Sequence, residues 1–275
     1  MGTRLPPGAV AFAAYILVNL IADNFETGGR DAVGGTAVAR LVGMDTATRA
    51  ELSPPISSLT ERGLTFAVDA LTKTDSDLAR VVAAFGCPPL WARPSGFPTL
   101  IHIILEQQVS LASAQAAFDR LSAAGPVRPE SFLRFSDNEL RMIGFSRQKA
   151  AYVRSLAAAL LSGEMDLEGL EHQDDGLARS SLTNLKGIGP WSADIYLMMA
   201  LRRPDVWPRG DLALNQALQE VKGLAKRPTQ EEASAIAERW RPWRAAAARV
   251  LWHWYLSTPR RRASATQQTS RLVNR

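Results

Sequence analysis

Apolar residues recur at helical spacing along most of the chain from about residue 60. One stripe has members at i, i+3, i+4, i+7 and i+8, the period of one face of an α-helix. Its members are Val153, Leu156, Ala157, Leu160 and Leu161. Ser146 precedes the stripe and is a good N-cap residue, because its hydroxyl can accept a hydrogen bond from a free backbone N–H. We therefore predict a helix that begins just after Ser146.

Two other stretches have the same period. The first predicts one long apolar helix or a close pair of helices, with Leu100, Ile103, Ile104, Val109 and Leu111 as its apolar positions. The second follows Asp211 and contains Leu214, Ala217, Leu218 and Val221. Alternation of the kind that marks strands is hard to find past residue 60. The predicted fold class is all-α, with the short connections that are typical of helix bundles.

Both ends of the chain differ from this helical part. Residues 8–22 form an apolar run of fifteen residues, which is short for a membrane span, since a span needs about 20. The run is followed by only a weak signal-peptide cleavage site. We expect no membrane anchor, and a peripheral helix or an upstream extension instead. The predicted domains are a poorly defined extension at 1–60, a helical core at 61–257 and a basic tail at 258–275.

Charge and cysteine content narrow the possible functions. The 275 residues carry a formal net charge of +5. The tail contains five arginines and no acid, so residues 1–257 are formally neutral. The tail is either a solvated terminus or a contact with a polyanion such as DNA. The single Cys87 excludes a disulfide framework, and the three histidines have no metal-ligand spacing.

The stretch "LKGIGPW" at 185–191 predicts a helix–hairpin–helix. Pro190 suits the first turn of a helix, because its φ is already fixed near the helical value and it lacks an N–H that would go unpaired there. Trp191, Ile195, Met198 and Met199 continue one helical face, and the helix is expected to end near Arg202–Pro204. The glycines allow positive φ and close approach of a partner to amides at a helix N-terminus, which is a phosphate site. An ordinary turn between two helices is the alternative.

Five ordered stretches carry a family resemblance. They are "LIHIILEQQVSLASA", "LRMIGFSRQKAAYVRSLA", "LKGIGPWSADIYLMMAL", "PRGDLALNQAL" and "AERWRPWRAAAARVLWHWY", and they span roughly 65–256. Together they resemble the helix–hairpin–helix base-excision DNA glycosylases that have a Gly/Pro-rich loop followed by Asp. The similarity is greatest to the AlkA-type DNA-3-methyladenine glycosylase II group. The resemblance implies a two-lobed helical core, here without the β-rich N-terminal domain of some members.

The resemblance implies a function and a set of site residues. The function is removal of an alkylated purine from double-stranded DNA, by a monomer in the cytoplasm at the nucleoid. Asp211 matches the catalytic carboxylate, although an Asp before an apolar helix is also a favoured N-cap. Trp191 and Trp252 match the base-pocket tryptophans, each with core packing as the alternative. Ile195 stands where the family has a third aromatic residue, and Tyr196 is a possible substitute.

Other positions follow from the same resemblance. The hairpin residues expected to contact DNA are Gly187, Ile188, Gly189 and Lys186, with plain surface charge as the alternative for Lys186. Gln108 matches the wedge that fills the space left by the flipped nucleotide, with a helix-surface residue as the alternative. The family's monovalent cation, Na⁺ or K⁺, would be bound by the backbone carbonyls of Thr183, Leu185 and Ile188; no other cofactor is expected.

Members that also cut the strand have a lysine at the position of Trp191, so the resemblance implies a monofunctional enzyme that leaves an abasic site. The alternatives are a non-catalytic lesion sensor built on the same hairpin and a glycosylase/lyase for oxidised bases. The carboxylate of Asp211 argues against the first, and the missing lysine argues against the second.

Overall fold

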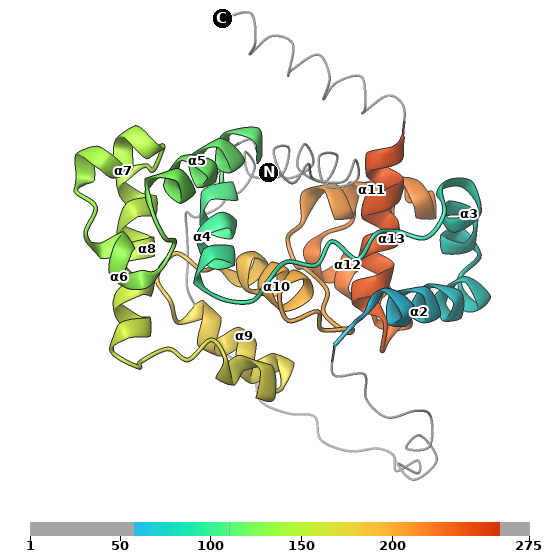
Figure 1. Cartoon of the computed structure of the whole chain (residues 1–275). Helices are drawn as coiled ribbons and strands as arrows, with labels where there is room; N and C mark the ends of the chain where they lie inside the picture. Colours follow the sequence, from blue (N-terminus) through green and yellow to red (C-terminus); the bar gives the residue numbers. More distant parts are fainter. Residues whose placement is uncertain (1–57, 110, 259–275) are drawn as a thin grey trace, which may run out of the picture.

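The computed structural model describes residues 58–109 and 111–258, which form helices joined by turns and by longer loops such as the segment between α3 and α4 (Figure 1). No strand occurs in these two ranges, in agreement with the all-α prediction. The α-helices are α2 (Glu61–Thr74), α3 (Ser76–Phe85), α4 (Phe97–Glu106), α5 (Leu111–Ala124), α6 (Pro129–Leu133), α7 (Asp137–Ile143), α8 (Arg147–Leu161), α9 (Asp175–Thr183), α10 (Pro190–Met199), α11 (Leu212–Lys222), α12 (Gln230–Ala237) and α13 (Arg244–Ser257). Two 3₁₀ helices are η2 (Gly169–His172) and η3 (Glu238–Trp240). Nearly all of the predicted extension (1–60) and tail (258–275) lies outside the described residues.

The helices form two lobes with α10 between them (Figure 1). In one lobe α4 contacts α5 and α8, and α8 contacts α6 and α7. In the other lobe α13 contacts α2, α3 and α11, so the first and last helices of the described core lie side by side. Helix α10 contacts both α9 and α4, and every residue from Ser192 to Met199 is buried. Arg249 of α13 also donates to the Met198 carbonyl, so this buried helix contacts both lobes.

Most helix boundaries follow the sequence pattern. The apolar stretch at 100–111 is a pair of helices, because α4 ends at Glu106 and α5 begins at Leu111. Ser146 caps α8 as predicted and accepts a hydrogen bond from the Lys149 N–H. Two details differ. Leu161, the last residue of α8, is 48% exposed because it lies beyond the buried face. Helix α10 ends at Met199, short of the predicted 202–204.

A buried arginine fixes the end of α10 against α13. Arg249 is 0% exposed and donates from its guanidinium to the carbonyls of Met198 at 2.7 Å, Leu90 at 2.9 Å and Ala245 at 2.9 Å. Burial lowers the pKa of Arg249 to about 10, so the side chain stays charged at neutral pH. The three hydrogen bonds therefore connect α10, α13 and the segment before α4 through one buried charge.

Within residues 58–109 and 111–258, none of the helices combines the length and apolar character that a membrane crossing requires. The apolar run at 8–22 lies outside these ranges.

Candidate active site and DNA-binding hairpin

The predicted hairpin connects α9 to α10. Gly187 has a φ of 90°, whereas Gly189 is the N-cap of α10 with a φ of −82°, so only the first glycine uses the left-handed freedom expected of both. A Cβ on Gly187 would lie 2.2 Å from Cγ of Tyr152, which is far closer than two carbon atoms can approach. Gly187 is therefore required by its φ and by the Tyr152 ring. A Cβ on Gly189 would meet nothing within 4 Å.

The hairpin presents its backbone to solvent at the start of α10. Gly189 has no side chain to accept from the first amides of α10, and Pro190 has no N–H to satisfy. Lys186 and Gly189 are exposed, but the side chain of Ile188 is 3% exposed and belongs to the core. Helix N-terminal amides without a capping side chain are suited to binding a phosphate. Of Ile188, only the backbone is available for such a contact.

Asp211 is a buried carboxylate that contacts the first turn of α10. It is the N-cap of α11, its Oδ1 accepts from the Leu214 N–H at 2.7 Å, and the residue is 1% exposed. The preceding Gly210 has a φ of 80°, so the chain turns sharply just before the carboxylate. The cap function predicted from sequence is confirmed, and it fixes Oδ1 of the carboxylate at the N-terminus of α11.

Two indole N–H groups converge on this carboxylate from different helices. Trp191 in α10 donates from Nε1 to Oδ2 of Asp211 at 3.1 Å, and Trp252 in α13 donates from Nε1 to Oδ1 at 3.4 Å. Trp252 is 0% exposed and Trp191 is partly exposed. Hydrogen bonds to an ionised acceptor are roughly twice as strong as neutral ones. The three residues that the sequence pointed to are therefore one hydrogen-bonded unit, built from three helices.

Ile195 and Tyr196 are placed in the interior of the protein. Ile195 is 1% exposed and Tyr196 is 0% exposed. The Tyr196 hydroxyl accepts from the Gly96 N–H at 2.8 Å, at the start of α4, and burial raises the pKa of this phenol. The Tyr196 hydroxyl thus has a structural partner, and a part for either residue in a base pocket stays a prediction.

The turn between α4 and α5 contacts the hairpin directly. Gln108 is exposed with a left-handed φ of 58°, which is uncommon for a residue with a side chain. Its neighbour Gln107 donates from Nε2 to the Gly187 carbonyl at 2.8 Å and to Oγ of Ser192 at 3.2 Å. Sequence reasoning missed Gln107, because a glutamine that follows a helix has many possible partners. This contact sets the position of the exposed Gln108 relative to the hairpin.

Lys149 supports the same turn from α8. Its Nζ donates to the Leu105 carbonyl at 2.7 Å, which satisfies one of the free carbonyls at the C-terminal end of α4. Burial lowers the pKa of Lys149 to about 8. The α4–α5 turn is consequently held by contacts from both α8 and the hairpin.

Among the residues that the structure describes, no group of three His, Cys, Asp or Glu side chains could hold a metal ion. The backbone carbonyls proposed for a monovalent cation are a different kind of ligand. The Leu185 carbonyl accepts from the Ile188 N–H at 3.0 Å, and a carbonyl oxygen has a second lone pair with which it can bind a cation.

Comparison with known proteins gives a consistent result. Residues 101–242, more than half of the chain, match the family model for the HhH-GPD superfamily base excision DNA repair protein. A DNA-3-methyladenine glycosylase of Bacillus subtilis is 30% identical over 172 residues, which are 58% of this chain and 57% of that protein. DNA-3-methyladenine glycosylase 1 of Schizosaccharomyces pombe is 32% identical over 161 residues, 57% of this chain and 71% of that one.

Among solved structures, the Schizosaccharomyces pombe 3-methyladenine DNA glycosylase Mag1 in complex with abasic DNA superposes with a TM-score of 0.63 at 29% identity. The alignment covers 68% of this chain and 95% of that one. The matched residues include the hairpin, α10 and the loop that carries Asp211. This chain belongs to the HhH-GPD superfamily of base-excision DNA repair proteins.

Proposed function

We propose that the protein is a DNA glycosylase that removes alkylated purines, of the 3-methyladenine and 7-methylguanine type, from double-stranded DNA. The observation that supports this most is the buried Asp211 carboxylate, held by the N–H groups of Leu214, Trp191 and Trp252 next to the hairpin. The names of the similar proteins point to the same class of substrate. The proposed place of action is the nucleoid in the cytoplasm, and the proposed active form is a monomer.

The chemistry follows from the charge of the damaged base. A purine alkylated at N3 or N7 is cationic, so it can leave as a neutral base when the electrons of the N-glycosidic bond move to it. The sugar then develops oxocarbenium character, which a nearby carboxylate stabilises. Water attacks C1′ and completes the hydrolysis, with its proton accepted by Asp211 or solvent. The indole donors keep the Asp211 oxygens in a fixed orientation for this purpose.

The DNA contacts in this proposal are distributed over the two turns. The amides at the start of α10 and the side chain of Lys186 bind phosphate, and the target nucleotide is flipped out of the duplex. Gln108, exposed on its strained turn, fills the vacated space. A partly exposed indole at Trp191 offers an electron-rich ring to the cationic base, and cation–π contacts of this kind contribute about 0.5–2 kcal/mol.

Two finer points belong to the same proposal. Trp191 stands where strand-cutting members have lysine, and an indole cannot form a Schiff base, so the expected product is an intact abasic site. A monovalent cation bound by the carbonyls of Thr183, Leu185 and Ile188 would add positive charge where the DNA backbone approaches.

The test uses duplex DNA with 3-methyladenine or 7-methylguanine, followed by chromatography of the free base. We expect the free methylated purine to appear, with strand cleavage only after alkali. Cleavage without alkali, with the product trapped by borohydride, would contradict the monofunctional assignment. DNA binding without any base release would contradict the glycosylase proposal and favour a lesion sensor.

A further inference from the structure

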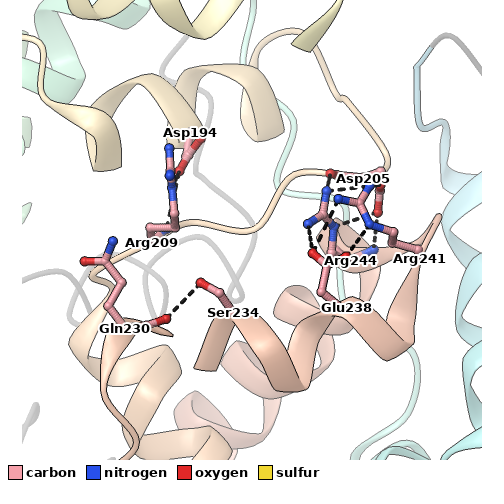
Figure 2. Close-up of polar contacts among 8 residues, drawn as sticks. All are labelled: Asp194, Asp205, Arg209, Gln230, Ser234, Glu238, Arg241 and Arg244. Carbon is pink, nitrogen blue, oxygen red and sulfur yellow. Dashed lines mark hydrogen bonds and ion pairs between the residues drawn. The ribbon is translucent and has the colours of Figure 1, made fainter. Parts of the chain in front are cut away.

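A buried aspartate in α10 contacts the loop that leads to Asp211. Asp194 lies one helical turn after Trp191 and is 0% exposed. Its Oδ1 accepts from Nε of Arg179 in α9 at 2.5 Å. Its Oδ2 accepts from the backbone N–H of Arg209 at 3.3 Å and lies 3.8 Å from Nε of the same residue. Figure 2 shows the Arg209 side chain directed at Asp194.

This carboxylate has a demanding environment. Burial raises the pKa of Asp194, and the arginines at 179 and 209 oppose that effect. A charge taken out of water is tolerated only when it is paired and hydrogen-bonded. Asp194 meets this requirement with donors on both oxygens, from α9 on one side and from the loop on the other.

The two contacts between α10 and the loop involve neighbouring points on both partners. On α10 they come from Trp191 and Asp194, three residues apart on the same side of the helix. On the loop they fall at Arg209 and Asp211, on either side of Gly210 with its φ of 80°. Two ties around one flexible residue restrict rotation of the loop in a way that either tie alone would not.

We propose that Asp194 is a positioning residue that holds the loop at Arg209 and thereby fixes the carboxylate of Asp211 against Trp191. This inference rests on the proposed glycosylase function for its effect on rate, but the anchoring itself is independent of any activity. Arg179 and the Arg209 N–H donate to different oxygens of Asp194. In Asn one of these two positions is an NH₂ donor, so one of the two contacts is lost.

The same connection contains a matched control. Asp205 pairs with Arg244 at 2.9 Å and with Arg241 at 2.6 Å, and it also accepts from the Arg244 N–H at 3.4 Å. Figure 2 shows this cluster, with Glu238, apart from the Asp194–Arg209 pair. Asp205 is thus an ion-paired aspartate with a backbone contact, but its partners lie just after η3 and in α13 rather than in the turn before Asp211.

The experiment compares Asp194→Asn with Asp205→Asn in the full chain. Hydrogen exchange of peptides covering 207–212 reports the anchoring, and single-turnover base release with saturating enzyme reports the chemistry. Affinity for a duplex with an abasic-site analogue reports binding. We expect faster exchange at 207–212 and a rate about 10- to 100-fold lower for Asp194→Asn, since a small misplacement of a catalytic group costs up to about 10². Its affinity should remain within about threefold of wild type, as should all three readouts for Asp205→Asn.

Equal exchange and equal rates in the two variants would overturn the proposal, as would a loss of affinity that parallels the loss of rate. Wild-type protein that releases no base would instead refute the glycosylase function, while the exchange comparison would still decide the anchoring. If Asp194→Asn does not fold, Asp194→Ser takes its place, because a hydroxyl avoids the extra amide donor and the charge is still removed.

Discussion

Replacing Asp211 by Asn removes a charge from the proposed active site with little change of shape. Asn caps helices about as well as Asp, so its oxygen can keep the 2.7 Å bond from the Leu214 N–H. Its amide group then faces Nε1–H of Trp191, which lies 3.1 Å from Oδ2 in the wild type. A donor facing a donor costs about 1–3 kcal/mol of unfolding free energy. Since the free energy of unfolding of a domain is about 5–15 kcal/mol, the variant should fold.

The expected loss of rate follows from burial of the carboxylate. Asp211 is 1% exposed, so an effective dielectric constant of about 20 is more suitable than that of water. An oxocarbenium ion about 4 Å from the carboxylate then gains about 4 kcal/mol, against about 1 kcal/mol in water. At 1.36 kcal/mol for each factor of ten, the loss is about 10³-fold for a buried site and only about fivefold for a solvated one.

The assay is single-turnover release of 7-methylguanine, with binding to an abasic-analogue duplex measured alongside. Asp174→Asn is the matched control, because Asp174 caps α9 by accepting from the Gly176 and Leu177 N–H groups and has no part in the site. The control should keep the wild-type rate. A folded, DNA-binding Asp211→Asn that retains more than about a tenth of the wild-type rate would refute the electrostatic reasoning.

Three other predictions test the supporting structure. Gly187→Ala should lower the free energy of unfolding by about 2–5 kcal/mol in urea titrations, because Ala is strained at a positive φ and its methyl group overpacks the Tyr152 ring. Gly189→Ala should lower it by under about 1 kcal/mol. Similar losses in the two variants would contradict the close approach of Tyr152. Gln108→Gly should raise the free energy of unfolding by up to about 1–2 kcal/mol, because glycine adopts the positive φ without strain. It should also slow base release, because no side chain then fills the space left by the flipped nucleotide. An unchanged rate would contradict the wedge role of Gln108. Burial lowers the pKa of Lys149 to about 8 from 10.5, so the folded state binds fewer protons than the unfolded state between these values. The free energy of unfolding of the wild type, measured by urea titration, should therefore rise relative to that of Lys149→Met between pH 8 and pH 10. Partial exposure of the lysine reduces the size of this effect. A difference in unfolding free energy that does not change with pH would contradict the prediction.

The residues near one another in sequence were predictable. The periodic stripes located the helices, Ser146 and Asp211 were recognised as caps, and "LKGIGPW" identified the hairpin. Each of these depends on hydrogen bonds or side-chain spacing within a few residues, which the local sequence specifies. Asp211 and the two tryptophans were also chosen from the sequence, but through family resemblance rather than through any physical signal of contact.

Contacts between distant segments were decided by tertiary structure. Trp252 is 41 residues from Asp211 along the chain. Tyr152 is 35 residues from Gly187, the glycine that its ring makes necessary. Gln107 and Asp194 were not singled out, because a glutamine after a helix and an aspartate in an apolar helix have many possible partners. Their partners depend on how α4, α9 and α10 cross, and those crossings are set by side-chain packing over the whole core. The local sequence thus determined the helices and the hairpin, and the assembled core determined which N–H groups meet the carboxylates.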